Sequence, residues 1–476
     1  MKKNNAFRRA AALMAALSIT VSLAAPAFAG TYYIDNGDIT VTKNADGSQT
    51  VEQNGTSNND SDEIIITTTG AAITTLESDL EGPAAEDSDF GPVVEDNYQS
   101  AQPESTEESE DADQPEIAEE PKSADRQESA DQQAAPAAAP AGSAPVNKKD
   151  DGFWGNTITV INNIADKVLN LTLKDVKIDV SDTGDQYDWD QKGKAALSVQ
   201  GKGNVEIELD GDNELKSGTQ SAGLEKTSTG TLTLKDDNNE AGSLTATGGF
   251  NSAGIGGGYL GDGKNITITG GTVNATGGSS GAGIGGGRDG KGENITIKGG
   301  TVNATGNEDG AGIGGGSSGS GENITINDGK VTATGGSYAA GIGGGSVGAW
   351  GGAEGGSGKN ITINGGTVNA TGTDGGAGIG GGENGNGEDI TINGGKVNAS
   401  GAYGGAGIGG GVNGIGSKVT VSGAAQVTAT ATGSGPDWSG VGTGATIGNG
   451  GSKTPDGPVD GKEIQADISG VTTGYI

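Results

Sequence analysis

The chain has 476 residues, with 62 acidic and 28 basic side chains, a formal net charge of −34, and neither cysteine nor histidine. Without these residues it has no disulfides, no Ser-His-Asp or Cys-His nucleophile system and no His-rich zinc site. The acidic balance argues against nucleic acid as a partner, because phosphate binding needs clustered Lys and Arg.

Residues 1–29 have the pattern of a secretory signal peptide. A basic start precedes an apolar run from Ala10 to about Ala24, and the small residues Ala27-Phe-Ala29 predict cleavage before Gly30. No later apolar run approaches the ~20 residues that a membrane-spanning helix needs. We therefore expect an extracellular protein, secreted or held at the cell surface, that does not span a membrane.

Two segments follow before the main body of the chain. Residues 30–74 contain strand-like runs at 38–42 and 63–67, which predict a β-hairpin or the first incomplete coil of a larger stack. From 75 to 150 acidic residues dominate and eight of the twelve prolines occur, so we expect a disordered acidic linker.

Residues 151–250 predict degenerate copies of a unit that becomes regular over 251–435. In the regular zone an isoleucine within Gly-Ile-Gly recurs at intervals of 29, 29, 29, 37 and 29 residues. Leu197 and Leu224 take the same phase in the degenerate zone. The isoleucines of the regular zone are Ile255, Ile284, Ile313, Ile342, Ile379 and Ile408.

Each regular repeat carries three short strand signals, such as 253–255, 266–268 and 273–275, with Ile, Val and Ala alternating against Thr or Asn. Repeats of this length form supersecondary units that are stable only when stacked. The pattern predicts an all-β fold, a parallel β-helix of about nine 29-residue turns. The nonapeptide of a calcium β-roll and the six-residue punctuation of a left-handed helix are both missing.

Residues 436–476 form a degenerate end. Ser439-Gly-Val-Gly442 resembles a degenerate Gly-Ile-Gly, and three prolines interrupt the repeat pattern. We expect that the chain is incomplete here or that its anchor lies elsewhere.

The repeated residues have sufficient structural explanations. Glycine runs such as Gly285 to Lys291 lack the Ser or Thr and the strand-to-helix context of a phosphate loop, so they predict tight corners. Asparagines that recur in register predict amide ladders along the stack. Together with the threonine column that includes Thr267, they would also form a flat polar face that could bind sugar hydroxyls or ice.

The best carboxylate cluster is in the loop 181–194. Oxygen ligands at this spacing suit Ca²⁺, although a full EF-hand pattern is missing and Lys192 occupies the place of a ligand; a solvated acidic loop is the alternative. Tyr187 and Trp189 in the same loop suit a sugar ring. The candidate metal ligands are Asp182, Asp185, Asp188 and Asp190.

The other candidate ligand-binding residues are aromatic. Phe250, Tyr338 and Tyr403 lie four or five residues before a repeat isoleucine, and Trp350 lies in the eight-residue insertion. Aromatic platforms stack on sugar faces, but isolated rings also fill corners.

The strings Ala-Gly-Ile-Gly-Gly-Gly, Asn-Ile-Thr-Ile-Asn-Gly-Gly and Val-Asn-Ala-Thr-Gly, and the segment Val205 to Leu215, resemble a family of exported Gram-positive, clostridial-type carbohydrate-binding β-helix surface proteins. The resemblance covers most of residues 151–476. It implies a right-handed, single-stranded helix with a pectate-lyase-like fold, calcium sites, and binding of acidic or plant-type polysaccharide without cleavage.

These observations predict a non-catalytic, carbohydrate-binding or adhesin-like surface protein whose partner is a polysaccharide or a host or cell-wall glycan. A passive stalk is the structural alternative. A lyase would need a basic residue beside calcium-binding carboxylates on one strand face, whereas Arg288 is in a loop, so we expect no enzyme. Self-association is left open by the sequence.

Overall fold

The computed structural model describes the chain in several stretches, and the predicted signal peptide, nearly all of the predicted linker and Trp350 lie outside them. All described residues belong to one compact unit, and the chain's second unit, Ala72–Gly142, lies outside the described residues. The described residues are 30–60, 64–68, 147–149, 151–238, 240–347, 354–433 and 440–476.

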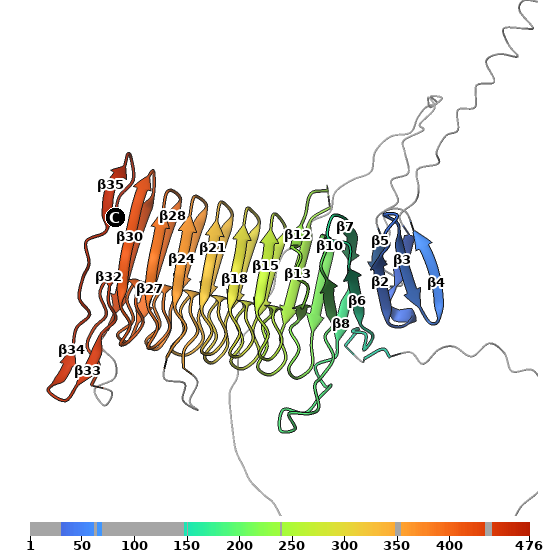
Figure 1. Ribbon diagram of the computed structural model, residues 1–476, viewed down its shortest axis with the longest axis horizontal. Coiled ribbons are helices and arrows are strands. Elements are labelled where there is room, and N and C mark those ends of the chain that lie inside the picture. The colour runs from blue at the N-terminus through green and yellow to red at the C-terminus, as the bar shows by residue number, and fades with distance from the viewer. Residues whose placement is uncertain are drawn as a thin grey trace, which may run out of the picture. The chain divides into compact units, whose positions relative to one another are not determined.

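The described unit is a parallel β-helix, which confirms the predicted fold class (Figure 1). Each regular turn contributes one strand to each of three sheets, which we name A, B and C. The strands pair with the equivalent strands of the turns before and after, so the hydrogen bonds run along the stack. A single 3-10 turn, η1 (Ile34–Asn36), is the only helical element among the described residues.

Sheet B contains the isoleucine of the repeat and has 13 strands. Eleven of them stack in parallel, and β3 and β4 add to the first by antiparallel pairing, so the described chain has more coils than the nine we expected. In spatial order the strands are β4 (Thr56–Asp60), β3 (Gln49–Gln53), β2 (Ile39–Lys43), β6 (Ile158–Asn162), β9 (Leu197–Gly201), β11 (Leu224–Lys226), β14 (Ile255–Gly256), β17 (Ile284–Gly285), β20 (Ile313–Gly314), β23 (Ile342–Gly343), β26 (Ile379–Gly380), β29 (Ile408–Gly409) and β32 (Ile447–Gly448).

Sheet A carries the Ile-Thr-Ile strands. Its members are β1 (Gly30–Tyr33), β5 (Ile64–Thr67), β7 (Val168–Lys174), the first half of β10 (Asn204–Lys216), β12 (Leu232–Lys235), β15 (Gly263–Ile268), β18 (Gly292–Ile297), β21 (Gly321–Ile326), β24 (Gly358–Ile363), β27 (Gly387–Ile392), β30 (Gly416–Gly423) and β35 (Asp467–Val471).

Sheet C carries the Val-Asn-Ala strands. The long strand β10 passes from sheet A into sheet C, so the two sheets are continuous there. The other members of sheet C are β8 (Lys177–Asp179), β13 (Gly242–Thr247), β16 (Thr272–Thr276), β19 (Thr301–Thr305), β22 (Lys330–Thr334), β25 (Thr367–Thr371), β28 (Lys396–Ala402) and β31 (Gln426–Thr432).

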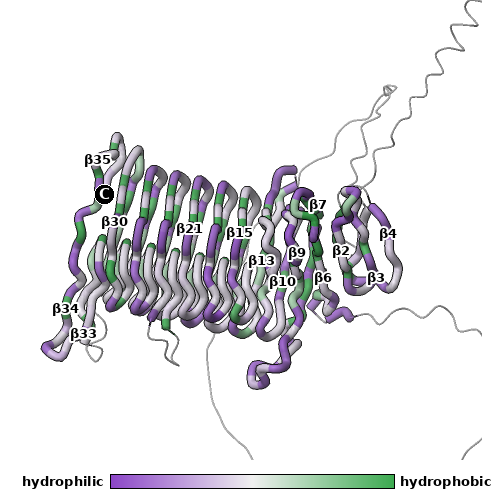
Figure 2. The backbone as a smooth tube through the Cα atoms, viewed as in Figure 1, coloured by the Kyte–Doolittle hydropathy of each residue, from purple (hydrophilic) through white to green (hydrophobic). Residues whose placement is uncertain are grey.

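The core is a set of aliphatic columns. Ile284, Ile295, Ile297 and Val302 from one turn are all fully buried, and each pairs in register with the same residue type in the next turn. Figure 2 shows the result as hydrophobic and hydrophilic residues alternating along the strands, with pale glycine-rich loops between them. Stacking is the source of stability, because one turn buries too little apolar surface to offset its ordering entropy.

The recurring asparagine of sheet A has two structural roles. Asn265 and Asn294 both have φ of +56°, the left-handed conformation that asparagine tolerates better than most residues. Their side chains also form the expected ladder, since Asn294 Nδ2 donates to Asn265 Oδ1 at 3.1 Å. In sheet C, Asn303 Nδ2 donates to Asn274 Oδ1 at 2.8 Å. The predicted amide ladders are thus present.

The glycine of the Gly-Ile-Gly core that follows the isoleucine is required by space and by backbone conformation. Gly314 has φ of +137°, and a Cβ atom placed there would lie 2.0 Å from the carbonyl oxygen of Gly343 in the next turn. The corners are therefore a packing device, as predicted.

The two ends close the stack differently from the middle. At the start, β2 pairs in parallel with β6 and β5 pairs in parallel with β7, so residues 30–67 supply the first coil together with an antiparallel extension. At the other end, β33 (Ser452–Thr454) and β34 (Gly457–Val459) form a hairpin before β35 joins sheet A.

The last isoleucine of sheet B is not where the sequence pattern suggested. Ile447 pairs with Ile408, so the repeat continues at 446–448 and the expectation for Ser439 to Gly442 is wrong. A longer connection precedes this turn, which shifts the spacing away from 29. No helix among the described residues is long and apolar enough to cross a membrane.

Candidate functional site

The loop 181–194, which connects β8 to β9, is tied to the stack at several points. Gly193 N donates to Thr219 O at 2.8 Å, and Thr219 N donates to Thr183 O at 3.0 Å. In Figures 1 and 2 the segment between β8 and β9 projects from the stack as a hydrophilic hairpin. These backbone bonds give the hairpin a defined base.

Two side chains continue this attachment. Lys192 Nζ lies 2.9 Å from the buried Glu225 Oε1 of β11, which explains the lysine at a position where a metal ligand was sought. Gln220 Nε2 donates to Trp189 O at 3.2 Å. These contacts hold the loop against the turn of Leu224.

The four aspartates of the loop mostly contact partners within the protein. Asp182 accepts from Lys149 Nζ at 3.0 Å, Asp185 from Tyr187 N at 2.8 Å, and Asp188 from Gln191 Nε2 at 2.7 Å. The described residues contain no group of three acidic, histidine or cysteine side chains gathered as for a metal ion. The structure therefore does not bring Asp182, Asp185, Asp188 and Asp190 together, and calcium binding there stays a prediction.

Trp189 makes an aromatic contact that the sequence did not reveal. Its ring centroid is 5.3 Å from that of Tyr259, with the planes tilted by 40°. Trp189 is 51% exposed, and Tyr187 beside it is 85% exposed. Tyr259 lies four residues after Ile255, and Tyr259 N donates to the carbonyl oxygen of Gln220 at 3.1 Å, so the pair is supported by the same residue on both sides.

The remaining candidate aromatics are not joined to this pair or to one another by a ring contact in the described residues. Phe250 is half-buried, and its carbonyl oxygen accepts from Gln220 N at 2.9 Å. Tyr338 and Tyr403 are 40% and 47% exposed. Trp350 lies outside the described residues, so only Tyr187 and Trp189 of the predicted aromatics share a site.

A shallow trough lies on the outer face of sheet A. It has a volume of about 460 Å³ and contains Thr267 of the predicted threonine column. Lys235 in the trough is 3.8 Å from Glu206 and 3.9 Å from Asp237, so its charge is balanced. The lining residues are Asn204, Glu206, Thr231, Thr233, Lys235, Asp237, Thr267, Thr269 and Lys298.

Two carboxylates on the glycine-rich corner have perturbed acidity. Burial raises the pKa of Asp309, and burial together with the charge of Asp309 raises the pKa of Glu383. Ser346 Oγ donates to Asp309 Oδ1 at 2.9 Å, and Ser346 belongs to the turn between them. The positive charge of Arg288 offsets part of this increase in the pKa of Asp309. The Arg288 guanidinium also lies 3.6 Å from the Asp289 carboxylate. The sequence pattern did not reveal this pair because its members lie in different repeats, with the turn of Ser346 between them.

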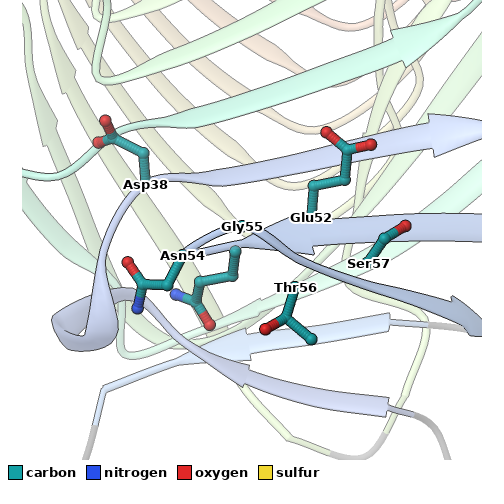
Figure 3. Close-up of a pocket in the computed structure, with 7 residues that line it drawn as sticks. Asp38, Glu52, Asn54, Gly55, Thr56 and Ser57 are labelled. Atoms are coloured by element: carbon teal, nitrogen blue, oxygen red, sulfur yellow. The ribbon is translucent and has the colours of Figure 1, made fainter. Parts of the chain in front are cut away.

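The N-terminal coil contains a separate hollow of about 280 Å³ that involves Asp38 and Glu52. Figure 3 shows that their side chains and those of Asn54, Thr56 and Ser57 do not converge on one point. Asp38 Oδ1 accepts from Thr157 N at 2.7 Å, so this carboxylate holds the first coil to the next. The hollow is a structural feature.

Comparison with known families supports the architecture. Six segments match the family model described as "Beta helix repeat", and together they cover less than half of the chain. This chain is a parallel β-helix protein. No curated protein and no solved structure matches it. The matched segments are 240–259, 266–288, 295–317, 324–346, 361–383 and 390–412.

The matched segments also distinguish the repeats that the family model describes from the parts of this β-helix protein that it does not describe. Tyr259 is the last residue of the first matched segment. The loop 181–194 and the turn of Leu224 lie before residue 240 and outside every match. The aromatic pair is therefore formed where a matched repeat meets a segment that the repeat model does not describe.

Proposed function

We propose that this protein is an extracellular, non-catalytic carbohydrate-binding or adhesin-like protein and that the Trp189–Tyr259 pair is the centre of its binding site. One observation carries the proposal: two aromatic rings from different turns have centroids 5.3 Å apart, and Trp189 is 51% exposed. Aromatic rings offer apolar faces to the C–H face of a sugar, and held rings lose little entropy on binding.

The outer face of sheet A also supplies polar groups that suit a saccharide. The trough on this face presents threonine hydroxyls and an asparagine amide. Such groups donate and accept hydrogen bonds, as sugar hydroxyls require.

The test is calorimetric titration of polysaccharides from plant and bacterial cell walls, with and without Ca²⁺, using the protein and the variants Trp189→Ala and Tyr259→Ala. We expect each variant to lose at least about tenfold in affinity, because stacking contributes on the order of 1 kcal/mol or more. Tyr403→Ala is the matched control, since Tyr403 is 47% exposed without a ring partner in the described residues. Binding unchanged in Trp189→Ala would overturn the proposal in favour of a passive stalk.

An enzymatic alternative has one observation in its favour, the paired carboxylates Asp309 and Glu383 with raised pKa values. A carboxyl group that stays protonated at higher pH can act as a general acid. Release of reducing ends or unsaturated uronides from a polysaccharide, lost in Asp309→Asn, would establish this function. Arg288 acts on Asp309, but it lies in a turn beside Asp289 and not on a strand face, so we propose the binding function.

A further inference from the structure

Two corner positions of the regular repeat vary from turn to turn, whereas the strand positions hardly change. One is the residue four places after each repeat isoleucine, and the other is the residue four places before it. Both lie on the loops that flank sheet B, and we call the two columns together the variable seam. The first column holds Tyr259, Arg288, Ser317, Ser346, Glu383 and Val412, and the second holds Asn251, Ser280, Asp309, Tyr338, Gly375 and Gly404.

One backbone hydrogen bond per turn joins the two columns. Ser346 N donates to Asp309 O at 2.8 Å, and in the next turn Glu383 N donates to Tyr338 O at 2.8 Å. The variable side chains of successive turns therefore lie next to one another on a regular backbone. Loops that vary on a constant repeat scaffold are where repeat proteins bind their partners.

The exposed apolar side chains of the regular turns also lie on these loops. Between β11 and β31, every large hydrophobic side chain of the described residues that is well exposed is in a loop beside sheet B, and none is in a strand of sheet A or C. Single exposed hydrophobic residues are ordinary, but their concentration beside one sheet indicates a contact surface. These residues are Leu260, Tyr338, Tyr403 and Ile415.

Tyr338 belongs to an apolar patch that forms around two glycines of the seam. A Cβ atom at Gly375 would lie 3.0 Å from Val412 Cγ2 and 3.5 Å from Tyr338 Cδ1. A Cβ atom at Gly404 would lie 2.9 Å from Val412 Cγ2 and 2.8 Å from Val441 Cγ1. The glycines thus leave room for Val412, which lies between Tyr338 and Val441. Tyr338 remains 40% exposed, so the patch has an accessible apolar side.

The same part of the seam carries a carboxylate without a counter-ion. Glu383 is level with Tyr338, because their backbones share a hydrogen bond, and it forms no ion pair among the described residues. The charge of Asp309, one turn away, adds to that of Glu383. Arg288 acts on Asp309, but its guanidinium also lies 3.6 Å from Asp289. A cationic side chain brought to Glu383 from outside would therefore be attracted.

The composition of the patch fits a polypeptide better than a glycan. A polymer of identical sugar units is matched by like residues at like spacing, as in the threonine column of sheet A. Along the seam, in contrast, Ser346, Glu383 and Val412 follow one another at successive turns. Each turn offers a different group, first a hydroxyl, then a carboxylate, then an aliphatic chain. Neighbouring side chains of a protein can match such a mixture of apolar and polar contacts.

We propose that this patch docks a polypeptide segment of a partner protein in which a Lys or Arg side chain neighbours an aromatic or aliphatic one. The basic side chain would pair with Glu383, and the apolar one would pack against Tyr338 and Val412 beside Gly375. This surface is separate from the proposed carbohydrate site, because Glu383 and Tyr259 lie four turns apart in one column, about 19 Å at the usual strand spacing.

The experiment selects phage-displayed random peptides on the full protein at physiological ionic strength and removes those that also bind the Tyr338→Ala/Glu383→Gln double variant. We expect the enriched peptides to share a Lys or Arg beside an aromatic or aliphatic residue. In calorimetric titrations, each single variant should lower the affinity for these peptides at least tenfold. Two controls should not: Glu388→Gln, whose carboxylate lies 3.9 Å from Lys359 on sheet A, and Leu260→Ala, on the corner loop of another turn.

A second comparison separates direct contact from an altered fold. Replacing the basic residue of an enriched peptide with Gln should weaken binding to the parent protein about as much as Glu383→Gln does, and should change binding to Glu383→Gln much less. Enriched peptides without the basic and apolar pattern, or no peptide that distinguishes the parent protein from the double variant, would overturn the inference. A loss of glycan affinity in Tyr338→Ala would also overturn it, since the patch would then belong to the carbohydrate site. Failure of the proposed function is detected separately, by polysaccharide titration of Trp189→Ala.

Discussion

Lys192 Nζ and Glu225 Oε1 lie 2.9 Å apart and join the tip of the acidic loop to strand β11. The Glu225 side chain is 7% exposed, and its other oxygen accepts from Ala222 N at 3.2 Å. The pair connects the irregular loop that contains Trp189 to the stack.

Replacing Glu225 with Gln should loosen the loop. The variant loses the charge that fixes Lys192, and we expect a stability loss of about 1 kcal/mol because the carboxylate is buried. Hydrogen exchange of amides in 181–194 should accelerate, and glycan affinity should fall. The control is Glu322→Gln, whose partner Lys291 is half exposed and whose loss should cost under about 0.5 kcal/mol. Equal effects of the two variants would contradict this role.

Lys226→Met should stabilise the protein at neutral pH. The lysine pKa falls from 10.5 to about 8 on folding, so below pH 8 the folded state bears the full cost of a buried ammonium. Between pH 8 and 10.5 the unfolded state binds more protons, and this cost disappears as pH rises. Chemical denaturation should show that the free energy of unfolding of Lys226→Met exceeds that of the parent protein by up to about 3 kcal/mol at pH 7 and by little near pH 11.

The sign of that difference is the informative result. A residue kept for folding alone should not destabilise the fold at working pH, whereas a binding residue can. If Lys226→Met is less stable than the parent protein at pH 7, the ammonium is a structural support and the prediction is wrong.

Gly314→Ala should destabilise the regular turns. Its Cβ would collide with the carbonyl oxygen of Gly343, 2.0 Å away, and its φ of +137° is unfavourable for alanine. The expected loss is about 3 kcal/mol or more, from strain and from displaced strand pairing. Gly433→Ala is the control, because Gly433 has φ of +74° but nothing within 4 Å of the added atom. Thermal unfolding should separate the two variants.

Asn303→Ala tests the amide ladder. The variant removes the 2.8 Å bond from Asn303 Nδ2 to Asn274 Oδ1 on the half-buried face of sheet C. We expect a loss of about 1 kcal/mol by denaturant unfolding. Thr332→Ala, at the paired position of the next turn, removes a side chain with no ladder bond and should cost less. A larger loss for Thr332 would show that the ladder contributes little.

The regular part of the fold could be predicted because one spacing repeats. Once the isoleucines were placed 29 residues apart, the buried columns of Ile295, Ile297 and Val302 followed from strand alternation. The asparagine ladders followed as well. The pattern did not reveal that Asn265 and Asn294 also occupy a left-handed conformation, since the interruption of the pairing between β15 and β18 at these two residues is seen only in the structure.

The candidate site could be predicted only in part. Trp189 stood out as an aromatic in an acidic loop, but its contact with Tyr259 depends on how that loop folds back over another turn. Lys226 resembled any charged residue of a degenerate repeat. The signal that could have found it is the spacing from Leu224 to Leu232, which is shorter than the spacing from Ile255 to Ile266.

The most direct test of carbohydrate binding at this edge is hydrogen exchange of the full protein with and without saturating trigalacturonate. We predict that protection increases at 181–194 and around Tyr259, and that the regular turns from Ile284 to Ile408 do not change. Protection confined to those regular turns, or none at any glycan concentration, would contradict the assignment of the Trp189–Tyr259 edge as the binding site.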